Sequence, residues 1–194
     1  MAPPRVLLVC TANRCRSPLA AELLGRVLAA SSVEAAVDSA GLGDSGFPVT
    51  DETAEVTGRR GLDVTSHRSQ RVTRDLITDA DLVLGMERLH VRDVVIAVPT
   101  AWGSTFTLKE FVRRAEAIGP RPAEEPLPTW IARVHAGRQR RDLQGASPLD
   151  DVADPTGGTL AEHEDMAREV EALVDRLVDA AWPEAERPEP SSAS

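Results

Sequence analysis

Residues 6–28 read VLLVCTANRCRSPLAAELLGRVL, and this stretch decides the fold. It opens with a continuous apolar run, which is typical of a central parallel strand covered on both faces. It closes with apolar residues at helical spacing, with Ser17 placed to cap the helix and Pro18 in the first turn. A strand, a short polar loop and a helix therefore follow one another, and a cysteine stands where the strand meets the loop.

The loop between this strand and this helix is expected to bind an anion. In an open α/β sheet, a loop at the carboxyl end of a strand, followed by a helix N-terminus, directs backbone N–H groups toward one point. Five residues separate Cys10 from Arg16, enough to surround a tetrahedral oxyanion and return the guanidinium over it. The candidate phosphate-binding residues besides Arg16 are Thr11, Ala12, Asn13, Arg14, Cys15 and Ser17.

Cys10 stands at the base of this loop and is the candidate nucleophile. The helix dipole, the loop amides and Arg16 all favour its thiolate form, to which Ser17 can donate a hydrogen bond. Arg16 can hold two phosphate oxygens with its planar fork. Because the amides and Arg16 supply the charge stabilisation, the sequence predicts that neither a metal nor a cofactor is needed.

A cysteine that displaces an alcohol from phosphorus needs an acid to protonate the leaving oxygen. The best candidate is Asp154, in the stretch DVADPTGG. Asp-Pro followed by glycines makes an ordered loop that can bring a carboxyl group over a pocket. Asp150 and Asp151 remain alternatives, although they lie farther from that turn.

Cys15 is the only other cysteine. Two cysteines exclude both a disulfide scaffold and a zinc site built from four cysteines. Cys15 either packs beneath the loop or forms a reversible disulfide with Cys10 that shields the nucleophile from further oxidation. His67 and His90 are expected to be structural or exposed rather than part of the site.

Strands and helices alternate along the rest of the chain. Strands are expected at 32–41, at 80–86 and briefly after 104, and helices at 51–61, 73–80, 87–98 and up to 118. Such alternation predicts an α/β fold in which a parallel sheet is covered by helices on both faces. A final amphipathic helix is expected to start near Thr159.

The length of 194 residues predicts one domain, residues 1–182, followed by a disordered proline-rich tail, residues 183–194. Residues 119–153 break the alternation with an acidic proline-rich stretch and a basic one, and we interpret them as an insertion or a lid. An exposed helix face is expected for the basic side chains Arg133, Arg138, Arg140 and Arg141.

Composition narrows the location and the partners. A net charge of −9 argues against a nucleic-acid partner. No apolar run reaches the roughly 18 residues of a membrane span, and the N-terminus enters a strand without a signal peptide. We therefore expect a cytoplasmic protein without a membrane partner, as a monomer or weak dimer.

These motifs resemble those of the low-molecular-weight protein tyrosine phosphatase family, in a bacterial, actinobacterial-like form. The likeness rests on CTANRCRSP, DSAG (38–41), GLDVTSHRS (61–69), ADLVLGMERLH (80–90) and the Asp-Pro before the final helix, in the family's order. The resemblance implies a three-layer α/β/α sandwich with a four-stranded parallel sheet and the phosphate-binding loop after the first strand.

The resemblance also implies roles for residues. Cys10 would become a phosphocysteine, which water then hydrolyses, and Asp154 would act first as acid and then as base. Arg16 would bind phosphate and stabilise the transition state. Asn13 and Ser39 would fix the strained backbone of the loop.

Departures from the family pattern concern the substrate. Residues 156–158, Thr-Gly-Gly, stand where tyrosine-phosphatase members usually carry aromatic residues that wall the substrate ring. Arg14 replaces a small or aliphatic residue that touches the substrate. Stacking on a phosphotyrosine ring is then poorly provided for, unless Trp102 or Trp130 approaches the pocket.

The leading prediction is a cysteine-dependent, metal-independent phosphatase that acts on phosphotyrosine in a phosphorylated protein or on a small aryl phosphate. TFTLKEFV and DPTGG also resemble bacterial members that dephosphorylate arginine, but Arg14 would repel a guanidinium. An arsenate reductase of the same fold is a further alternative, although such enzymes use two additional cysteines and none follows Cys15. A non-catalytic phosphate-binding module is least favoured, because it would use neither Cys10 nor Asp154.

Overall fold

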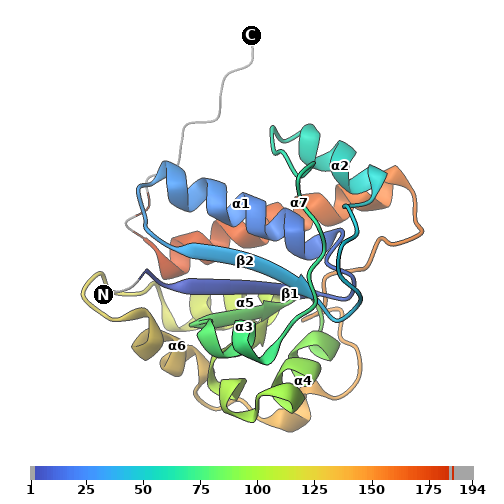
Figure 1. Ribbon diagram of the computed structural model, residues 1–194. Helices are drawn as coiled ribbons and strands as arrows, with labels where there is room; N and C mark the ends of the chain where they lie inside the picture. Colours follow the sequence, from blue (N-terminus) through green and yellow to red (C-terminus); the bar gives the residue numbers. More distant parts are fainter. Residues whose placement is uncertain (1–2, 184, 186–194) are drawn as a thin grey trace.

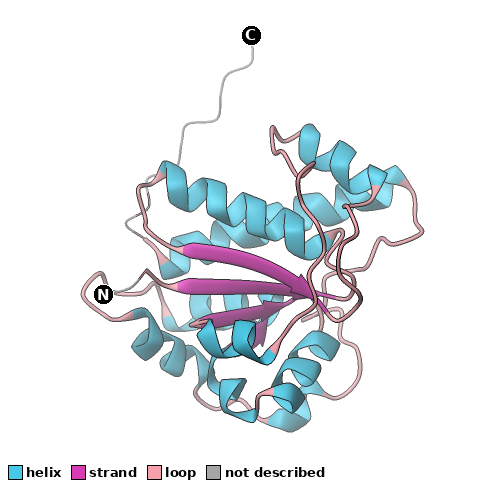
Figure 2. Cartoon of the chain, viewed as in Figure 1, coloured by secondary structure: helices cyan, strands magenta, loops and turns pink. Residues whose placement is uncertain are grey.

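The computed structural model describes residues 3–183 and residue 185. Within them, four parallel strands form one sheet between two layers of helices (Figure 1, Figure 2). The strands lie side by side in the order β2-β1-β3-β4. Their bounds are β1 (Arg5–Cys10), β2 (Ala36–Gly41), β3 (Leu82–Gly85) and β4 (Thr105–Thr107). The predicted α/β/α sandwich with a four-stranded parallel sheet is confirmed.

Helices connect the strands, so that consecutive strands run in the same direction. In the described part of the chain they are α1 (Arg16–Ala30), α2 (Asp51–Gly58), α3 (Arg74–Asp79), α4 (Arg88–Ala97), α5 (Leu108–Ile118), α6 (Leu127–His135) and α7 (Leu160–Ala181). Two 3-10 turns, η1 (Pro99–Ser104) and η2 (Arg140–Leu143), complete the described elements.

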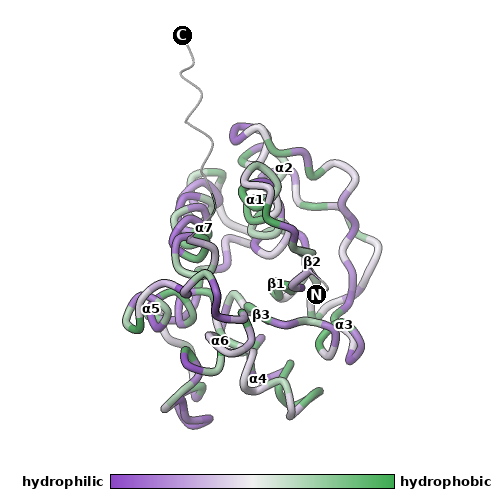
Figure 3. The backbone as a smooth tube through the Cα atoms, turned by 90° about the vertical axis from the view of Figure 1, so that its left-hand side faces the viewer, coloured by the Kyte–Doolittle hydropathy of each residue, from purple (hydrophilic) through white to green (hydrophobic). Residues whose placement is uncertain are grey.

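Alternate side chains of β1 point to the two helical layers. Leu7 and Val9 belong to a core cluster with residues of α3 and α4, whereas Val6 and Leu8 belong to the main core with α1, α5 and α7. In Figure 3 the strands lie between α1 and α7 on one side and α4 on the other. Both faces of β1 are therefore buried, which explains why its sequence shows no polar alternation.

The chain leaves β1 and β3 toward opposite faces of the sheet. Helix α1 follows β1 into the main core, and α4 follows β3 into the other cluster. The carboxyl ends of β1 and β3 therefore border a crevice, the place where open α/β sheets bind ligands. The loops after the strands gather at this end of the sheet in Figure 2. The fold thus brings residues 11–15 and 86–87 together.

Two predicted starting points can be compared with the structure. β2 begins at Ala36 rather than at residue 32, because Ser32 adopts a left-handed backbone conformation (φ 56°) in the turn after α1. Helix α7 follows its N-cap Thr159, whose side chain accepts a hydrogen bond from the Glu162 N–H, so the predicted start is confirmed.

The predicted cap at Ser17 is wrong. Helix α1 begins at Arg16, two residues earlier than a cap at Ser17 would place it, and its N-cap Cys15 makes no side-chain cap hydrogen bond. The Ser17 hydroxyl lies 3.0 Å from Cys10 Sγ instead, inside the loop. The second role predicted for Ser17, as the hydrogen-bond partner of the Cys10 sulfur, is therefore confirmed.

Residues 119–153 join α5 to the loop before α7. Helix α6 lies in this segment, and its Leu127, Trp130 and Ile131 belong to the main core. The Trp130 ring packs edge-on against Phe111 of α5, with the ring centroids 5.7 Å apart. The segment therefore adds to the core and carries the chain back to the crevice.

Arg138 contradicts the exposed helix face expected for the basic stretch. Its side chain is 1% exposed and donates to both carboxylate oxygens of Glu110, at 2.7 and 2.8 Å. The guanidinium lies between the rings of Trp102 and Phe106, 4.1 and 3.9 Å from their centroids. A buried carboxylate and two aromatic faces thus hold an arginine that the local sequence places on the surface.

The tail predicted at 183–194 lies outside the described residues, except for Pro183 and Ala185. Ala185 packs against the main core, and its N–H donates to the Trp182 carbonyl at 2.9 Å. Among the described helices, none is long and apolar enough to cross a membrane.

We predict that Arg138→Met destabilises the fold by about 3–5 kcal/mol, because it leaves the buried Glu110 carboxylate unpaired. The double variant with Glu110→Met should recover most of that loss. Urea unfolding measures both. Arg133→Met, which breaks an exposed ion pair with Glu125, is the control and should cost less than about 1 kcal/mol. A cost of that small size for Arg138→Met would contradict the account.

Candidate active site

Cys10 ends β1 at the base of the loop. Its Sγ accepts a hydrogen bond from the Asn13 N–H at 3.2 Å and lies 3.0 Å from Ser17 Oγ. Helix α1 begins directly after the loop and points its N-terminus toward the same place. A backbone N–H group, a hydroxyl group and a helix N-terminus therefore surround the sulfur atom.

Asn13 holds the loop in an unusual conformation. Its backbone is left-handed (φ 52°), a region that asparagine tolerates better than most residues. Its Nδ2 donates to Ser17 Oγ and Ser39 Oγ, at 3.0 and 2.8 Å, and its Oδ1 accepts from the Gln70 N–H at 2.9 Å. His67 Nε2 lies 2.8 Å from its carbonyl oxygen. The Asn13–Ser39 pair implied by the resemblance is therefore in contact, and Gln70 and His67 complete the support.

Gly41, at the end of β2, lets the loop approach the sheet. A Cβ at this position would lie 2.7 Å from Asn13 N and 2.9 Å from Thr11 O. Both are backbone atoms, so a side chain here would displace the loop itself. The glycine of the DSAG motif is thus required by close approach rather than by a turn.

Arg16 is 1% exposed and carries its guanidinium to the centre of the crevice. Nη1 donates to the Glu87 carboxylate and to the Val152 carbonyl, the latter at 3.0 Å. Nη2 donates to Asp154 Oδ2 at 2.6 Å and to Thr11 Oγ1 at 3.4 Å. Arg16 therefore contacts residues that follow β1 and β3 as well as the loop before α7.

Asp154 is the only one of the three candidate acids that the structure brings to Arg16. Its Oδ1 accepts from the N–H and the hydroxyl of Thr156, at 3.1 and 2.8 Å, which orients the carboxyl group. Asp150 is buried in ion pairs with Arg88 and Arg113.

The Asp151 side chain binds backbone N–H groups instead of Arg16. Its carboxylate accepts from the N–H groups of Arg88, at 2.8 Å, and Ser147, at 2.7 Å. Because the Val152 N–H also donates to the Met86 carbonyl at 2.8 Å, this loop is anchored to the end of β3. Asp150 and Asp151 thus position the loop that presents Asp154.

His90 is buried behind Thr11 and is not among the residues that line the pocket, in keeping with the structural role that the sequence favoured. Its Nδ1 accepts from the Glu87 N–H at 2.9 Å, so the proton lies on Nε2, which donates to Thr11 Oγ1 at 3.1 Å. Burial, followed by the positive charge of Arg16, lowers the pKa of His90 to about 3. The imidazole is therefore neutral and orients the Thr11 hydroxyl at the pocket.

Cys15 lies beneath the loop as a buried thiol. Burial is the main cause that raises its pKa to about 11, and a hydrogen bond with Thr53 opposes that shift. Both cysteines are free in the structure. Of the two alternatives for Cys15, packing under the loop is the one present here.

The pocket above Cys10 has a volume of about 130 Å³. Its lining comprises Cys10, Thr11, Ala12, Arg14, Cys15, Arg16, Thr50, Asp154 and Thr156. No aromatic ring is among these residues, and the two tryptophans considered for that role lie elsewhere. Trp130 is fully buried in the core, and Trp102 packs on Arg138. None of the residues that line the pocket can therefore stack on a substrate ring.

The comparison with family models decides the classification. A model described as "Low molecular weight phosphotyrosine protein phosphatase" matches residues 5–126. The chain belongs to this family. The match contains the loop, Gly41, Glu87 and His90, and it ends before Asp154.

Individual relatives in this family cover different shares of the chain. A protein-arginine-phosphatase of Geobacillus stearothermophilus is 31% identical over 91% of this chain and 95% of its own length. A probable low-molecular-weight protein-tyrosine-phosphatase, EpsP, of Ralstonia solanacearum is 40% identical over 54% of this chain and 70% of its own length.

Solved structures of the family show the same fold. The YwlE arginine phosphatase from G. stearothermophilus superimposes with a TM-score of 0.67, 31% identity, and coverage of 91% of this chain and 92% of its own. A low-molecular-weight protein tyrosine phosphatase from T. tengcongensis gives a TM-score of 0.69, 30% identity, and coverage of 91% and 98%.

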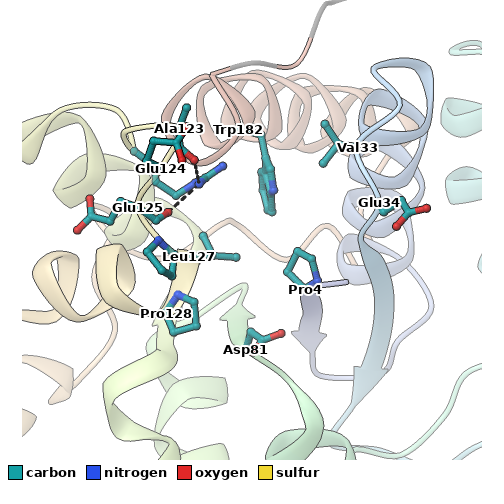
Figure 4. Close-up of a pocket in the computed structure, with 12 residues that line it drawn as sticks. Pro4, Val33, Glu34, Asp81, Ala123, Glu124, Glu125, Leu127, Pro128 and Trp182 are labelled. Carbon is teal, nitrogen blue, oxygen red and sulfur yellow. Dashed lines mark hydrogen bonds between the residues drawn. The ribbon is translucent and has the colours of Figure 1, made fainter. Parts of the chain in front are cut away.

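A separate hollow of about 400 Å³ lies at the opposite end of the sheet of this phosphatase-family fold (Figure 4). Pro4 before β1, Asp81 before β3 and Trp182 after α7 help to line it. The six residues of β1 span roughly 20 Å, so Cys10 lies far from this hollow. Although it is larger than the pocket above Cys10, it holds none of the candidate catalytic residues.

Sequence reasoning missed Glu87, Thr50 and Gln70. Glu87 carried a usable signal, because it lies two residues after β3, at the end of the sheet where ligands bind. Thr50 and Gln70 carried no signal in the sequence. Each lies in a loop that approaches residues 11–15 only in the folded chain.

We predict that Gly41→Ala lowers kcat/KM on an aryl phosphate by about 100-fold or more, because a loop displaced by about 1 Å no longer fits phosphate. Gly25→Ala is the matched control, since a Cβ there meets nothing within 4 Å and alanine favours a helix. Turnover is measured on folded protein, checked by circular dichroism. Full activity of Gly41→Ala would show that the close approach is unimportant.

The neutral state of His90 predicts a pH dependence of stability. Below pH 6.5 the unfolded imidazole takes up a proton that the folded one refuses until about pH 3, so stability falls as the pH falls. From pH 6.5 to about 4.5 this single group should cost roughly 2–3 kcal/mol. Urea unfolding of His90→Asn should show a smaller fall over that window. Equal falls in both proteins would refute a buried neutral His90.

Proposed function

We propose that this chain is a protein phosphatase that hydrolyses phosphomonoesters, phosphotyrosine in particular, through a phosphocysteine intermediate. The observation that carries the proposal is the convergence of Cys10 Sγ, the loop amides, Arg16 and Asp154 on one small pocket. A nucleophile, an oxyanion site and an acid are the groups that phosphoryl transfer to cysteine requires. Residues 1–182 would form the phosphatase domain that carries these groups.

In the first step, the Cys10 thiolate attacks phosphorus and forms the S–P bond. The P–O bond to the alcohol breaks, and the leaving oxygen takes a proton from the Asp154 carboxyl group. Two phosphate oxygens bind Arg16, and the others accept from the loop N–H groups. The substrate then takes the donor that Asp154 Oδ2 now occupies on Arg16 Nη2, 2.6 Å away, and frees that carboxyl to face the leaving group.

In the second step, water attacks the phosphocysteine. The Asp154 carboxylate accepts a proton from this water, the S–P bond breaks, and inorganic phosphate leaves with Cys10 restored as a thiolate. Glu87 remains on Arg16 throughout and keeps the guanidinium oriented when Asp154 lets go. The amides and Arg16 carry the negative charge in both steps, so no metal or cofactor is assigned a role.

The substrate is proposed to be a phosphorylated protein or, in the test tube, a small aryl phosphate. A net charge of −9 disfavours nucleic acid as a partner. A cytoplasmic location and a monomeric or weakly dimeric state complete the proposal.

Dephosphorylation of arginine is the second candidate. It is supported by a relative named as a protein-arginine-phosphatase that aligns over 91% of the chain. The absence of an aromatic wall among the residues that line the pocket is in keeping with it. Arg14 at the mouth opposes it, because two guanidinium groups would repel each other. Arsenate reduction is disfavoured, because no cysteine follows Cys15 to relay electrons. Burial also raises the pKa of Cys15 to about 11, which lowers the fraction of its reactive thiolate.

Phosphate release from phosphotyrosine, phosphoserine and phosphoarginine peptides and from a small aryl phosphate tests the proposal. We predict preference for phosphotyrosine and no turnover by Cys10→Ser, which should still bind phosphate. Asp154→Asn should lower kcat by about 10²- to 10⁴-fold, and less when the leaving phenol needs no proton. Preference for phosphoarginine would replace the first candidate by the second. Turnover by Cys10→Ser would contradict both candidates, because each requires Cys10 as the nucleophile.

A further inference from the structure

We propose that Arg14 makes the active site select phosphorylated segments that carry a carboxylate next to the phosphorylated residue. The inference rests on the proposed function, because it concerns the substrate of the same pocket. It names the class of substrate as acidic phosphopeptide segments, with Arg14 as the residue that recognises the acidic neighbour.

Arg14 is fixed at the mouth of the pocket. Its backbone belongs to the phosphate-binding loop, and its carbonyl accepts from the Thr50 N–H at 3.2 Å. Its Nε donates to the Pro48 carbonyl at 2.7 Å, and the guanidinium carbon lies 5.6 Å from the centroid of the Phe47 ring. Two contacts therefore hold the half-buried side chain in one place, whereas most surface arginines move freely.

The charge of Arg14 is not neutralised within the described part of the chain. Arg16 has carboxylate partners in Glu87 and Asp154, but no carboxylate there forms an ion pair with Arg14. Nε donates to the Pro48 carbonyl, and neither Nη atom donates a hydrogen bond to any residue among 3–183 and 185. A guanidinium in this state can donate both Nη groups to one incoming carboxylate.

The surroundings make this cation selective. The whole chain carries a net charge of −9 and so repels acidic segments at long range. Close to the pocket, a pinned cation replaces that repulsion with attraction, and little side-chain entropy is lost because Arg14 is already fixed. The same charge repels lysine or arginine beside the phosphorylated residue. The mouth therefore distinguishes acidic from basic substrate segments by charge, because none of the residues that line the pocket can stack on a substrate ring.

The test compares two phosphotyrosine peptides that differ only in having glutamate or lysine on both sides of the phosphotyrosine. The measured quantity is the ratio of kcat/KM for the acidic and the basic peptide within one protein. Any general loss of turnover in a variant cancels in this ratio. For the unaltered chain we expect a ratio of about 10 at low salt, which shrinks as ionic strength rises.

Arg14→Gln should bring the ratio close to one, and Arg14→Glu should invert it in favour of the basic peptide. The control is Arg26→Glu, the same charge change 10 residues farther along α1 from Arg16, about 15 Å along the helix axis. It should keep the ratio of the unaltered chain. If Arg14→Glu does not fold, the ratio measured for Arg14→Gln and the salt dependence of the ratio in the unaltered chain still test the role of Arg14.

A ratio near one in the unaltered chain, or an unchanged ratio in Arg14→Gln, would overturn the role of Arg14 while leaving the phosphatase reaction intact. Failure of the proposed function has a different signature, namely no Cys10-dependent release from either peptide or from the aryl phosphate. A merely structural Arg14 would lower turnover on both peptides equally. Only charge recognition moves the ratio.

Discussion

The Arg16 guanidinium is a cation buried almost completely in the crevice at the carboxyl end of the sheet, and a buried charge is tolerated only when partners surround it. Those partners come from distant parts of the chain. Glu87 follows β3, whereas Val152 and Asp154 belong to the loop before α7. The strand order, the course of residues 119–153 and the anchors of the final loop all serve to bring these groups to one point. The same charge then serves to bind phosphate.

The loop that carries Arg16 depends on a second constraint, which is steric. Its left-handed Asn13 is stabilised by side-chain hydrogen bonds from three segments, and Gly41 leaves room for its backbone. A loop fixed in this way can present its N–H groups to an oxyanion without reorganising, which is the main source of catalysis by fixed dipoles. His90 adds to this order, because a neutral imidazole can orient Thr11 without placing a second cation beside Arg16.

Local sequence was enough to predict the loop and the sheet. A buried strand, a polar loop and a helix are adjacent in the chain, so the positions of Cys10 and Arg16 relative to the helix follow from short-range rules. Asp154 was predicted from its turn, but only the structure separates it from Asp150 and Asp151, whose carboxylates are occupied elsewhere. That distinction depends on contacts across 60 or more residues in sequence, which no local pattern encodes.

The wrong predictions have the same physical origin. Arg138 reads as exposed within a basic stretch, yet Glu110 and two rings bury it. Ser17 is not the helix cap, because its hydroxyl lies against Cys10, which is the other contact predicted for it. In both cases a contact made by the folded chain outweighed the local helix preference. Sites for function are where such conflicts are expected, because a residue there serves a ligand as well as the fold.

The central claim is that phosphate passes through Cys10, and trapping the intermediate tests it most directly. Asp154→Ala should slow hydrolysis of the intermediate, so mixing it with an aryl phosphate that has a good leaving group and quenching within milliseconds should capture phosphoenzyme. Peptide mass spectrometry of the quenched protein then locates the phosphoryl group. The account predicts it on the Cys10 sulfur, in step with a burst of about one phenol per enzyme. A burst with the phosphoryl group on any other residue would contradict the account.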